Sequence, residues 1–252
     1  MVEKAKDDAN NNQATGEERG KGRGRDGAPG AVWFREPQRR RRSPGLSRER
    51  IVATAVDRLD REGVDGLSLR KIAGDLDAHA TSLYWHVPTK GDVLDLALDE
   101  VFAEISLPAD HRARDWRDVV LVYMRELRAM LLRHPWAASL AGTRPLAGPH
   151  ALERSEAVYA ALTRAGFTGP TLAATAAAVS NLVIATAATQ AAWAERSEVG
   201  SRDALRGLVT DRQELYPTLA AHLEDFLGDW DTQFEIAAQT LVQGLAAQRT
   251  EQ

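Results

Sequence analysis

The stretch from Leu67 to Lys90, LSLRKIAGDLDAHATSLYWHVPTK, decides the fold of this chain. Ser68 is a suitable N-cap for a short helix whose apolar residues recur at helical spacing. The tripeptide Asp77-Ala78-His79 is typical of a turn, and a second helix is predicted from Ala80 to His86, before Pro88 interrupts it. Two short helices joined by a tight turn are the arrangement of a helix-turn-helix.

The second helix of this pair carries many hydrogen-bonding and aromatic side chains. Five of its residues are of this kind: Thr81, Ser82, Tyr84, Trp85 and His86. A helix that only packs into a core has little use for them, whereas a helix lying in a DNA groove needs such groups. In the alternative interpretation, the aromatic side chains belong to the core of a helical hairpin and the histidine is structural. The nearby basic residues Arg70, Lys71 and Lys90 favour the DNA-binding interpretation.

Helical periodicity continues on both sides of this stretch. A helix is predicted from Ser47, its N-cap, to Gly63, and another from about Thr89 to a point before Pro108. Residues 47–87 therefore predict a three-helix unit with short connections. Its small core is predicted to contain Leu69, Ile72, Ala73, Leu76, Leu83 and Val87.

The second half of the chain also has the pattern of an all-helical protein. The predicted helices span about 116–133, 135–140, 149–165, 216–227 and 230–248, together with a long alanine-rich helix that Thr168 and Pro170 open and that runs to about 195. Residues 196–212 are only partly helical by this pattern. The predicted fold class is all-α with about nine or ten helices, in which a helix-turn-helix DNA-binding domain precedes a larger helical domain. The predicted boundaries are a disordered basic tail at 1–45, the DNA-binding domain at 46–106 and the second domain at 107–252.

Composition limits the class of protein. The chain has 252 residues, a net charge of −4 and no cysteine, which excludes disulfides and thiolate metal sites. No uninterrupted apolar run approaches the roughly 20 residues that span a bilayer, and no secretory signal is visible, so a cytoplasmic protein without a membrane partner is expected. The charge is uneven, because six arginines lie between Gln38 and Arg50 while the chain after residue 91 is acidic. A local basic surface on an acidic protein is typical of DNA binding.

The N-terminal tail contains three features. The run Arg39–Arg42 is either a solvated segment or an arm that contacts phosphates or the minor groove. The match to GxGxxG at 22–27 is attributed to composition, because no strand precedes it and Pro29-Gly30 blocks a following helix. Val32, Trp33 and Phe34 form a small apolar group that could dock on the folded part.

The pattern LxxRxIAxxL, a turn and then ATSLYWHVPTK resembles the DNA-binding domain of the tetracycline-repressor (TetR) family over about residues 47–106. The resemblance implies that Arg70 reaches a guanine edge and that Thr81 and Tyr84 contact bases or a thymine methyl. It also implies that Ser68, Trp85, His86 and Lys90 hold phosphates, while Ala80 offers only apolar contact to a base. Asp77 stands where the family usually has glycine in the turn, and aspartate tolerates positive φ better than most residues.

A weaker resemblance to the regulatory domain of the same family covers Leu131–His134, Gly142–Pro145 and Ala165–Thr168. It implies a small-molecule effector in a cavity between the central helices. The residues expected to line that cavity are Met124, Trp136, Leu140, Phe167, Asn181, Ile184, Gln190 and Trp193.

The same resemblance implies a homodimer, in which two helices of each subunit pack as a four-helix bundle. The small and apolar residues expected at that interface are Ala173, Ala174, Ala176, Ala177, Ala178, Ala185, Ala187 and Ala188 on one helix, with Phe234, Ala237, Leu241, Gly244 and Leu245 on the other. In the alternative interpretation, these residues form an ordinary core within one chain.

The sequence departs from the tetracycline repressor at the residues that would hold a metal. Leu140 stands where that repressor has a metal-binding histidine, and Thr189 stands approximately where it has a carboxylate. The expected effector is therefore a small molecule other than magnesium–tetracycline, with no bound metal or cofactor.

The function predicted from these features is a dimeric repressor that binds a palindromic operator and is released by a small molecule. The alternative is a DNA-binding activator or architectural protein without a ligand. An enzyme is not expected, because the six histidines have no metal-ligand spacing and the sequence contains no GxSxG or P-loop motif.

Overall fold

A computed structural model describes residues 28–35, 46–195 and 199–250, and these residues form helices without any β-strand. This confirms the all-α prediction. After a 3-10 turn, η1 (Ala31–Trp33), the α-helices are α1 (Arg48–Gly66), α2 (Leu69–Asp75), α3 (Ala80–Tyr84), α4 (Lys90–Phe102), α5 (Trp116–Arg133), α6 (Pro135–Ala141), α7 (Pro149–Arg164), α8 (Gly169–Glu195), α9 (Val199–Asp211), α10 (Pro217–Ala221), α11 (Leu223–Phe226) and α12 (Trp230–Thr250).

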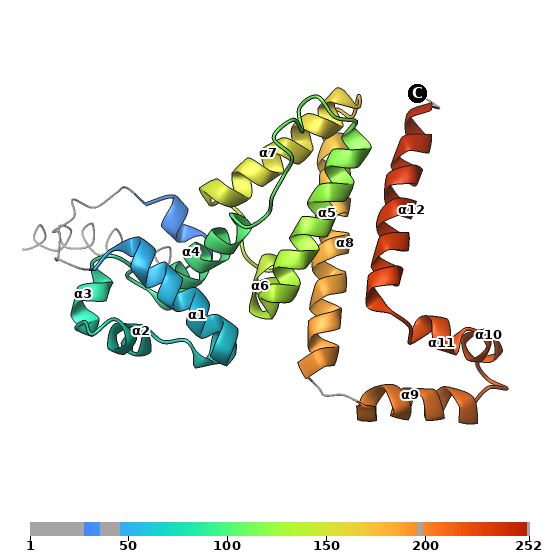
Figure 1. The fold of residues 1–252 in the computed structure, drawn as a ribbon, viewed down its shortest axis with the longest axis horizontal. Coiled ribbons are helices and arrows are strands. Elements are labelled where there is room, and N and C mark those ends of the chain that lie inside the picture. Colours follow the sequence, from blue (N-terminus) through green and yellow to red (C-terminus); the bar gives the residue numbers. More distant parts are fainter. Residues whose placement is uncertain (1–27, 36–45, 196–198, 251–252) are drawn as a thin grey trace, which may run out of the picture.

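The helices form two groups that α4 joins. Helices α1, α2 and α3 lie together at one end of the molecule, and α4 leads from them to a bundle of α5, α6, α7 and α8 (Figure 1). Helix α12 packs against α5 and α8 on the far side of the bundle. Helices α9, α10 and α11 project from the bundle as an arm between α8 and α12 (Figure 1). The helix-turn-helix is therefore presented at one end, away from the arm.

Local sequence signals account for where several helices begin. Ser47 and Ser68 accept hydrogen bonds from the backbone N–H three residues ahead, at 3.2 Å in each case, and so cap α1 and α2. Thr89 and Asp92 form a complete capping box at the start of α4. Pro149 is the first residue of α7, where its missing N–H costs no helical hydrogen bond. The predicted starts of these four helices are confirmed.

The helix count differs from the expected nine or ten, because twelve α-helices occur in the described ranges. One reason is that residues 199–211 form a regular helix, α9, where the pattern indicated only partial helicity. Another is that the helix expected over 216–227 is divided at His222, whose φ of −114° and ψ of 21° are not helical. Helix α3 is shorter than predicted, since it ends at Tyr84 instead of His86.

One hydrophobic core extends from the helix-turn-helix through α4 into the bundle. It contains the fully buried Leu83 of α3, Phe102 of α4 and Leu127 of α5, so both halves share packed side chains. The arm has a separate small cluster, made by Val209, Leu223 and Leu227. The arm is thus a packed unit of its own, while the core of the helix-turn-helix is continuous with that of the bundle.

Helix α8 is more apolar than the run-length argument indicated. Gly169–Ala194 has a mean hydropathy of 1.6 and is long and apolar enough to cross a membrane by length and composition alone. A core helix of a soluble protein meets the same criteria, and α8 packs against α5, α6, α7 and α12. Only 33% of its apolar window is buried within the chain, so α8 belongs to the bundle and also leaves one face uncovered.

Residues 28–35 depart from the disorder predicted for the whole of 1–45. They contain η1 and lie against α4, with Val32 buried. Val32 and Trp33 of the apolar group thus dock on the folded part, whereas Phe34 is 79% exposed. The Arg39–Arg42 run and the glycine-rich segment at 22–27 lie outside the described residues.

Candidate nucleic-acid interface and effector site

A small apolar core positions α2 and α3 relative to each other. Leu69, Ile72 and Ala73 on α2 are buried against Leu83 and Val87, as predicted. Leu76, the sixth predicted core residue, is half-buried and packs against the same cluster. Because Leu83 is the one buried residue of the five-residue helix α3, its side chain sets which face of α3 points outward.

The predicted DNA-contacting side chains lie on the outer surface of this unit. Arg70 and Thr81 are exposed, and Tyr84 and Trp85 are 52% and 75% exposed. This exposure argues against the interpretation in which both aromatic rings belong to a hairpin core. The other predicted contact residues are half-buried, and they are Ser68, Ala80, His86 and Lys90.

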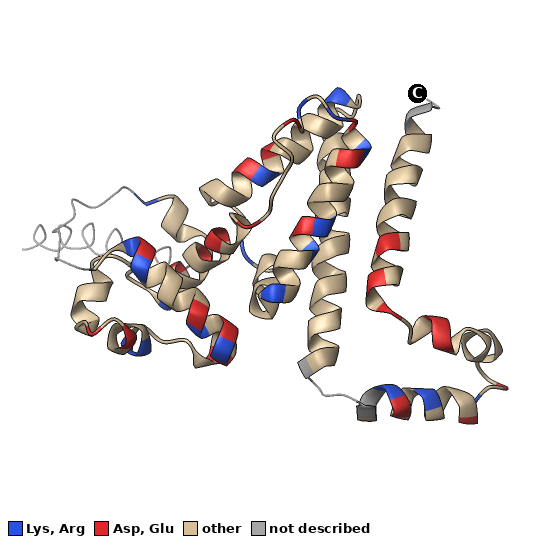
Figure 2. Ribbon diagram, viewed as in Figure 1, with Lys and Arg blue, Asp and Glu red and all other residues tan. Residues whose placement is uncertain are grey.

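The charged residues near α3 lie on the neighbouring helices. Helix α3 carries no charged side chain, while α1 and α2 carry basic and acidic residues (Figure 2). Arg70 on α2 has no ion-pair partner among the residues that the structure describes, so its guanidinium is available to an external acceptor. An uncharged helix beside a free guanidinium suits a surface that reads base edges by hydrogen bonds and apolar contact.

Two lysines hold the end of α1. The ammonium group of Lys71 donates to the carbonyl of Gly66 at 2.9 Å, and that of Lys90 donates to the carbonyl of Val64 at 2.7 Å. Both carbonyls lie in the short turn after a break in the helix at Gly63 (φ 66°, ψ −175°), where the Val64 carbonyl also accepts the backbone N–H of Leu67 at 3.3 Å. Lys90, which the resemblance places on a phosphate, therefore also has a structural contact. An ammonium group has three donors, so one contact leaves capacity for another.

An arginine in α1 fixes the position of α2. The side chain of Arg58 donates from Nε and Nη2 to the two carboxylate oxygens of Asp75, at 2.9 and 2.8 Å. Such a bidentate pair fixes orientation as well as distance. Hydrogen bonding to Asp75, opposed by burial, raises the pKa of Arg58 above its ordinary value. The pair therefore keeps α2 fixed when α3 meets an external surface.

The turn between α2 and α3 places Asp77 in a left-handed conformation, with φ of 49°. The prediction that aspartate adopts positive φ here is confirmed. Because glycine adopts this region without the steric cost that a Cβ imposes, Asp77→Gly is expected to raise the free energy of unfolding by about 0.5–1 kcal/mol. Urea unfolding followed by circular dichroism measures this. Asp77→Val should destabilise the protein, and equal stability of both variants would contradict the expectation.

Buried carboxylates join helix α4 to α7 and to the loop between α6 and α7. Asp99 accepts hydrogen bonds from the backbone N–H groups of His150 and Ala151, at 3.3 and 2.9 Å, and so caps the start of α7. Asp95 pairs with Arg144 in the loop between α6 and α7. A movement of α7 or of this loop would therefore be transmitted to α4. In the chain, α4 directly follows helices α1 to α3, which form the candidate DNA-reading unit and are called the reading unit.

A second junction is centred on His134, between α5 and α6. Its Nδ1 lies 2.7 Å from a carboxylate oxygen of Asp60 in α1, and its Nε2 lies 3.0 Å from one of Glu104, just after α4. Burial opposes the charged form of Glu104, yet hydrogen bonds from Arg133 and His134 outweigh burial and lower its pKa. This histidine therefore links both ends of the DNA-binding half to the bundle.

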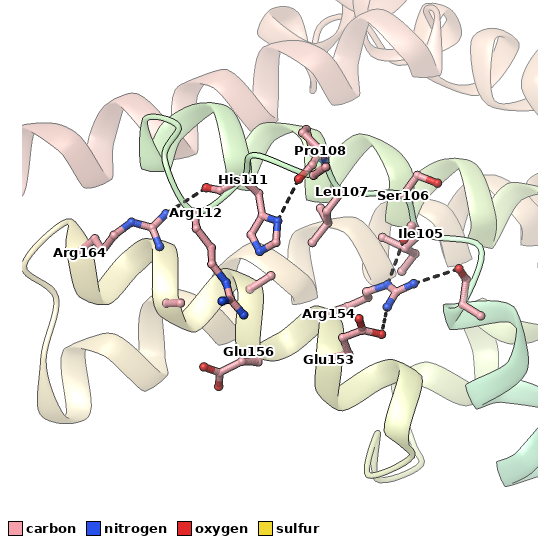
Figure 3. A pocket seen from close by; sticks show the side chains of 14 residues that line it. Ile105, Ser106, Leu107, Pro108, His111, Arg112, Glu153, Arg154, Glu156 and Arg164 are labelled. Carbon is pink, nitrogen blue, oxygen red and sulfur yellow. Dashed lines mark hydrogen bonds and ion pairs between the residues drawn. The ribbon is translucent and has the colours of Figure 1, made fainter.

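A cleft of about 830 Å³ lies between α7 and the segment that follows α4 (Figure 3). Arg154 of α7 donates to the carbonyls of Ile105 and Ala103, at 2.9 and 3.0 Å, so it holds the end of α4. His111 and Arg112 come from the opposite wall, and Arg112 points across the cleft toward α7 (Figure 3). A volume of this size is within the range of small-molecule sites.

The structure does not bring the eight predicted effector residues together. None of them lines the cleft of Figure 3. Trp136 lines a second cleft of about 580 Å³, and Gln190 and Trp193 line a third of about 490 Å³. Met124, Leu140, Phe167 and Ile184 are buried in the main core. Their role in ligand binding stays a prediction, and the sequence pattern missed the residues of the cleft in Figure 3 because they share no regular spacing.

Asn181 is exposed on α8, contrary to what a residue of an enclosed cavity requires. It belongs to a stripe of small exposed residues that recur at helical spacing along α8, comprising Ala173, Ala174, Ala177, Ala178, Asn181, Ala185 and Thr189. Two of the alanines expected at an interface, Ala176 and Ala187, are instead buried within the chain. The exposed stripe remains available to a partner.

Helix α12 presents a similar stripe. Ile236 is 61% exposed, and Thr240, Gly244 and Ala247 follow at helical spacing on the same exposed face. Of the residues expected there, Phe234 and Leu245 are buried within the chain, Ala237 and Leu241 are half-buried, and Gly244 is exposed. Ile236 was not among the expected residues, although its neighbour Ala237 was. Adjacent residues of a helix point about 100° apart, so Ile236 is exposed where Ala237 is half-buried.

The chain is similar to known regulators. Residues 107–249 match the family described as "Tetracyclin repressor-like, C-terminal domain". A protein of Saccharopolyspora erythraea named "HTH-type transcriptional regulator" is 53% identical over 222 residues, which cover 88% of this chain and 94% of that protein. The HTH-type transcriptional repressor DrrR1 of Streptomyces coeruleorubidus is 32% identical over 210 residues, covering 80% of this chain and 78% of DrrR1.

A solved structure extends the similarity to three dimensions. The TetR family protein ActR of Streptomyces coelicolor, crystallised in complex with (S)-DNPA, superposes with a TM-score of 0.72. It is 31% identical in sequence, and the superposition covers 82% of this chain and 100% of that one. The similarity therefore spans the reading unit and the bundle together.

Proposed function

The chain belongs to the tetracycline-repressor family of transcriptional regulators, and we propose that it is a homodimeric repressor released from a palindromic operator by a small molecule. The observation that carries this proposal is the outer surface of α2 and α3. There, Arg70, Thr81, Tyr84 and Trp85 are exposed around a short helix whose inner face is held by Leu83.

In the proposed complex, α3 of each subunit enters the major groove. Arg70, Thr81 and Tyr84 read bases, with Ala80 in apolar contact. The hydroxyl of Ser68 accepts the N–H of Lys71 and can still donate its own proton to a phosphate, which suits a residue that positions the backbone. Trp85, His86 and Lys90 are proposed to contact phosphate from the other end of α3.

The dimer is proposed to form through the exposed stripes of α8 and α12. Both stripes consist largely of small side chains, which let helices approach closely. They lie on long helices at the opposite side of the bundle from the reading unit (Figure 1). The twofold axis is proposed to pass through them, with the two α3 helices on successive turns of the same DNA face, roughly 34–36 Å apart as in other helix-turn-helix dimers.

The effector is proposed to bind in the regulatory half, with the cleft between α7 and the segment after α4 as its site. This location is supported by Arg154, which holds the carbonyls at the end of α4 from the wall of that cleft. A ligand there would act on the helix that follows the reading unit. Coupling of this type is typically about 1–3 kcal/mol. ActR, the related structure, was crystallised with a small molecule, which favours a ligand-responsive regulator over a ligand-free activator or architectural protein.

Magnesium–tetracycline is not the proposed effector. Leu140 is buried and apolar, and the side chain of Thr189 donates to the carbonyl of Ala185 at 2.9 Å, so neither position offers a metal ligand comparable to histidine or carboxylate. Isothermal titration calorimetry with tetracycline and magnesium is expected to detect no tight binding. Tight binding that disappears when magnesium is chelated would contradict this expectation.

Selection of bound duplexes from random DNA tests the proposed function. We expect a palindrome with half-sites one helical turn apart, bound by two subunits. A screen of small molecules for release of that duplex then tests the response to an effector. Recovery of sequences without a common motif would contradict a sequence-specific repressor and would favour an architectural protein.

A further inference from the structure

Residues 28–35, which we call the N-terminal strap, are bound to α4 although they are far from it in sequence. The backbone N–H of Gly30 donates to a carboxylate oxygen of Asp95 at 2.7 Å. The guanidinium of Arg35 donates to Asp92 at 2.8 Å. Between these two contacts, Val32 is only 8% exposed and packs into the main core. The strap is thus attached at both ends and in the middle.

The two carboxylates that hold the strap are themselves buried. The side chains of Asp92 and Asp95 are 2% and 1% exposed, and a buried carboxylate is destabilising unless charged or hydrogen-bonding partners surround it. Asp92 is partly satisfied by Thr89 in the capping box, and Asp95 by Arg144. The strap supplies the remaining donors. Its removal would therefore leave two buried carboxylates with fewer partners.

The strap also contacts the regulatory half. Gly30 has φ of 79°, and a Cβ at this position would lie 3.0 Å from Cγ of Pro145 in the loop between α6 and α7. The neighbouring Arg144 donates to Asp95 and to the carbonyl of Gly91 in α4, the latter at 3.2 Å. The strap, α4 and this loop therefore meet at Asp95 of α4, which accepts hydrogen bonds from Gly30 of the strap and from Arg144 of the loop.

We propose that the N-terminal strap is a conformational lock, which holds α4 against the loop between α6 and α7. The docked strap is held to α4 by the Gly30–Asp95 and Arg35–Asp92 contacts and lies against Pro145 of the loop, so α4 cannot tilt away from that loop without separating Gly30 from Pro145 or from Asp95. Because α4 connects the reading unit to the bundle, the lock restricts the angle between the reading unit and the bundle. The consequence for DNA rests on the proposed function: a docked strap restricts which half-site spacings the dimer accepts.

Thiol labelling tests the docking without DNA. The chain has no cysteine, so Val32→Cys and Phe34→Cys each introduce a single thiol. Phe34 is 79% exposed and serves as the matched control. With an aromatic disulfide reagent, the thiol at position 32 is expected to react about tenfold more slowly or less than the thiol at position 34. Equal rates in the folded protein would overturn the proposal.

A second variant releases the strap. Valine is unfavourable at φ of 79° and would meet Pro145, so Gly30→Val is expected to bring the labelling rate at position 32 up to that at position 34. Phe34→Ser, which changes an exposed side chain of the same strap, should leave the rate at position 32 unchanged. Slow labelling at position 32 in the Gly30→Val background would also overturn the proposal.

Duplexes recovered by selection then test the effect on the reading unit. Operator affinity of the unmodified chain should fall steeply when one base pair is added between the half-sites or removed. Gly30→Val should lose about threefold less affinity for the same change, because its α4 can adjust. Identical spacing profiles would overturn the lock. If no duplex is selected at all, the proposed function fails, and the labelling rates still decide whether the strap is docked.

Discussion

Replacement of Arg70 by alanine is expected to lower affinity for the selected operator by about 1–3 kcal/mol, roughly 5–150-fold, and to relax specificity at one base pair. The reason is that Arg70 is exposed on α2, has no ion-pair partner within the described residues, and can offer two parallel donors to a guanine edge. Fluorescence anisotropy on the operator and on all single-base variants of it measures both effects. The loss should be much smaller on random DNA.

Lys90→Ala is the matched comparison for Arg70→Ala. A lysine that holds phosphate contributes through charge, so its removal should weaken operator and random duplexes similarly. It should also reduce by about one the slope of log affinity against log salt concentration. Since Lys90 also bonds the carbonyl of Val64, unfolding of this variant should be measured alongside. Equal losses on operator and random DNA for Arg70→Ala would contradict its role in reading bases.

Replacement of Leu83 by alanine is expected to lower the free energy of unfolding by about 2–5 kcal/mol. Leu83 is fully buried, and it is the residue by which the five-residue helix α3 is attached to α2. Truncation of this side chain would leave a cavity, and α3 would no longer be held in one orientation relative to α2. Urea denaturation measures the loss, and operator binding should fall even at temperatures where the bundle remains folded.

Thr81→Ala separates binding from stability on the same helix. Thr81 is exposed, so its truncation should leave unfolding nearly unchanged while it weakens operator binding. A pair in which Leu83→Ala changes stability and Thr81→Ala changes only affinity would support the division of α3 into an inner and an outer face. A loss of less than about 1 kcal/mol for Leu83→Ala would show that α3 is held by other contacts.

Much of the helix-turn-helix could be predicted because its signals are local. Ser47, Ser68 and Thr89 cap helices whose apolar residues recur every three or four positions, and these cues act within a few residues. The exposure of Tyr84 and Trp85 follows from the same periodicity, since Leu83 takes the inner face. The positive φ of Asp77 was expected from the family resemblance, since Asp77 stands where the family usually has glycine.

The proposed effector site was less predictable from the sequence. The cleft between α7 and the segment after α4 is lined by residues such as His111, Arg112 and Arg154, which have no shared spacing in the sequence. Among the residues expected to line a cavity, Met124 is buried in the main core and Asn181 is exposed, and their role in ligand binding stays a prediction. Apolar character marks a helix face as buried, but it does not distinguish a face packed against another helix from one that borders a cavity.

The sequence by itself determined most of the helices, the starts of α1, α2, α4 and α7, and the inner and outer faces of α2 and α3, because capping and periodicity depend on neighbouring residues. Only the tertiary structure decided which distant groups meet. Asp95 accepts a backbone N–H from a residue 65 positions away, and His134 joins Asp60 of α1 to Glu104, which lies just after α4. Such contacts depend on how helices pack in space, and a buried carboxylate shows in the sequence only as one more polar residue in an apolar helix.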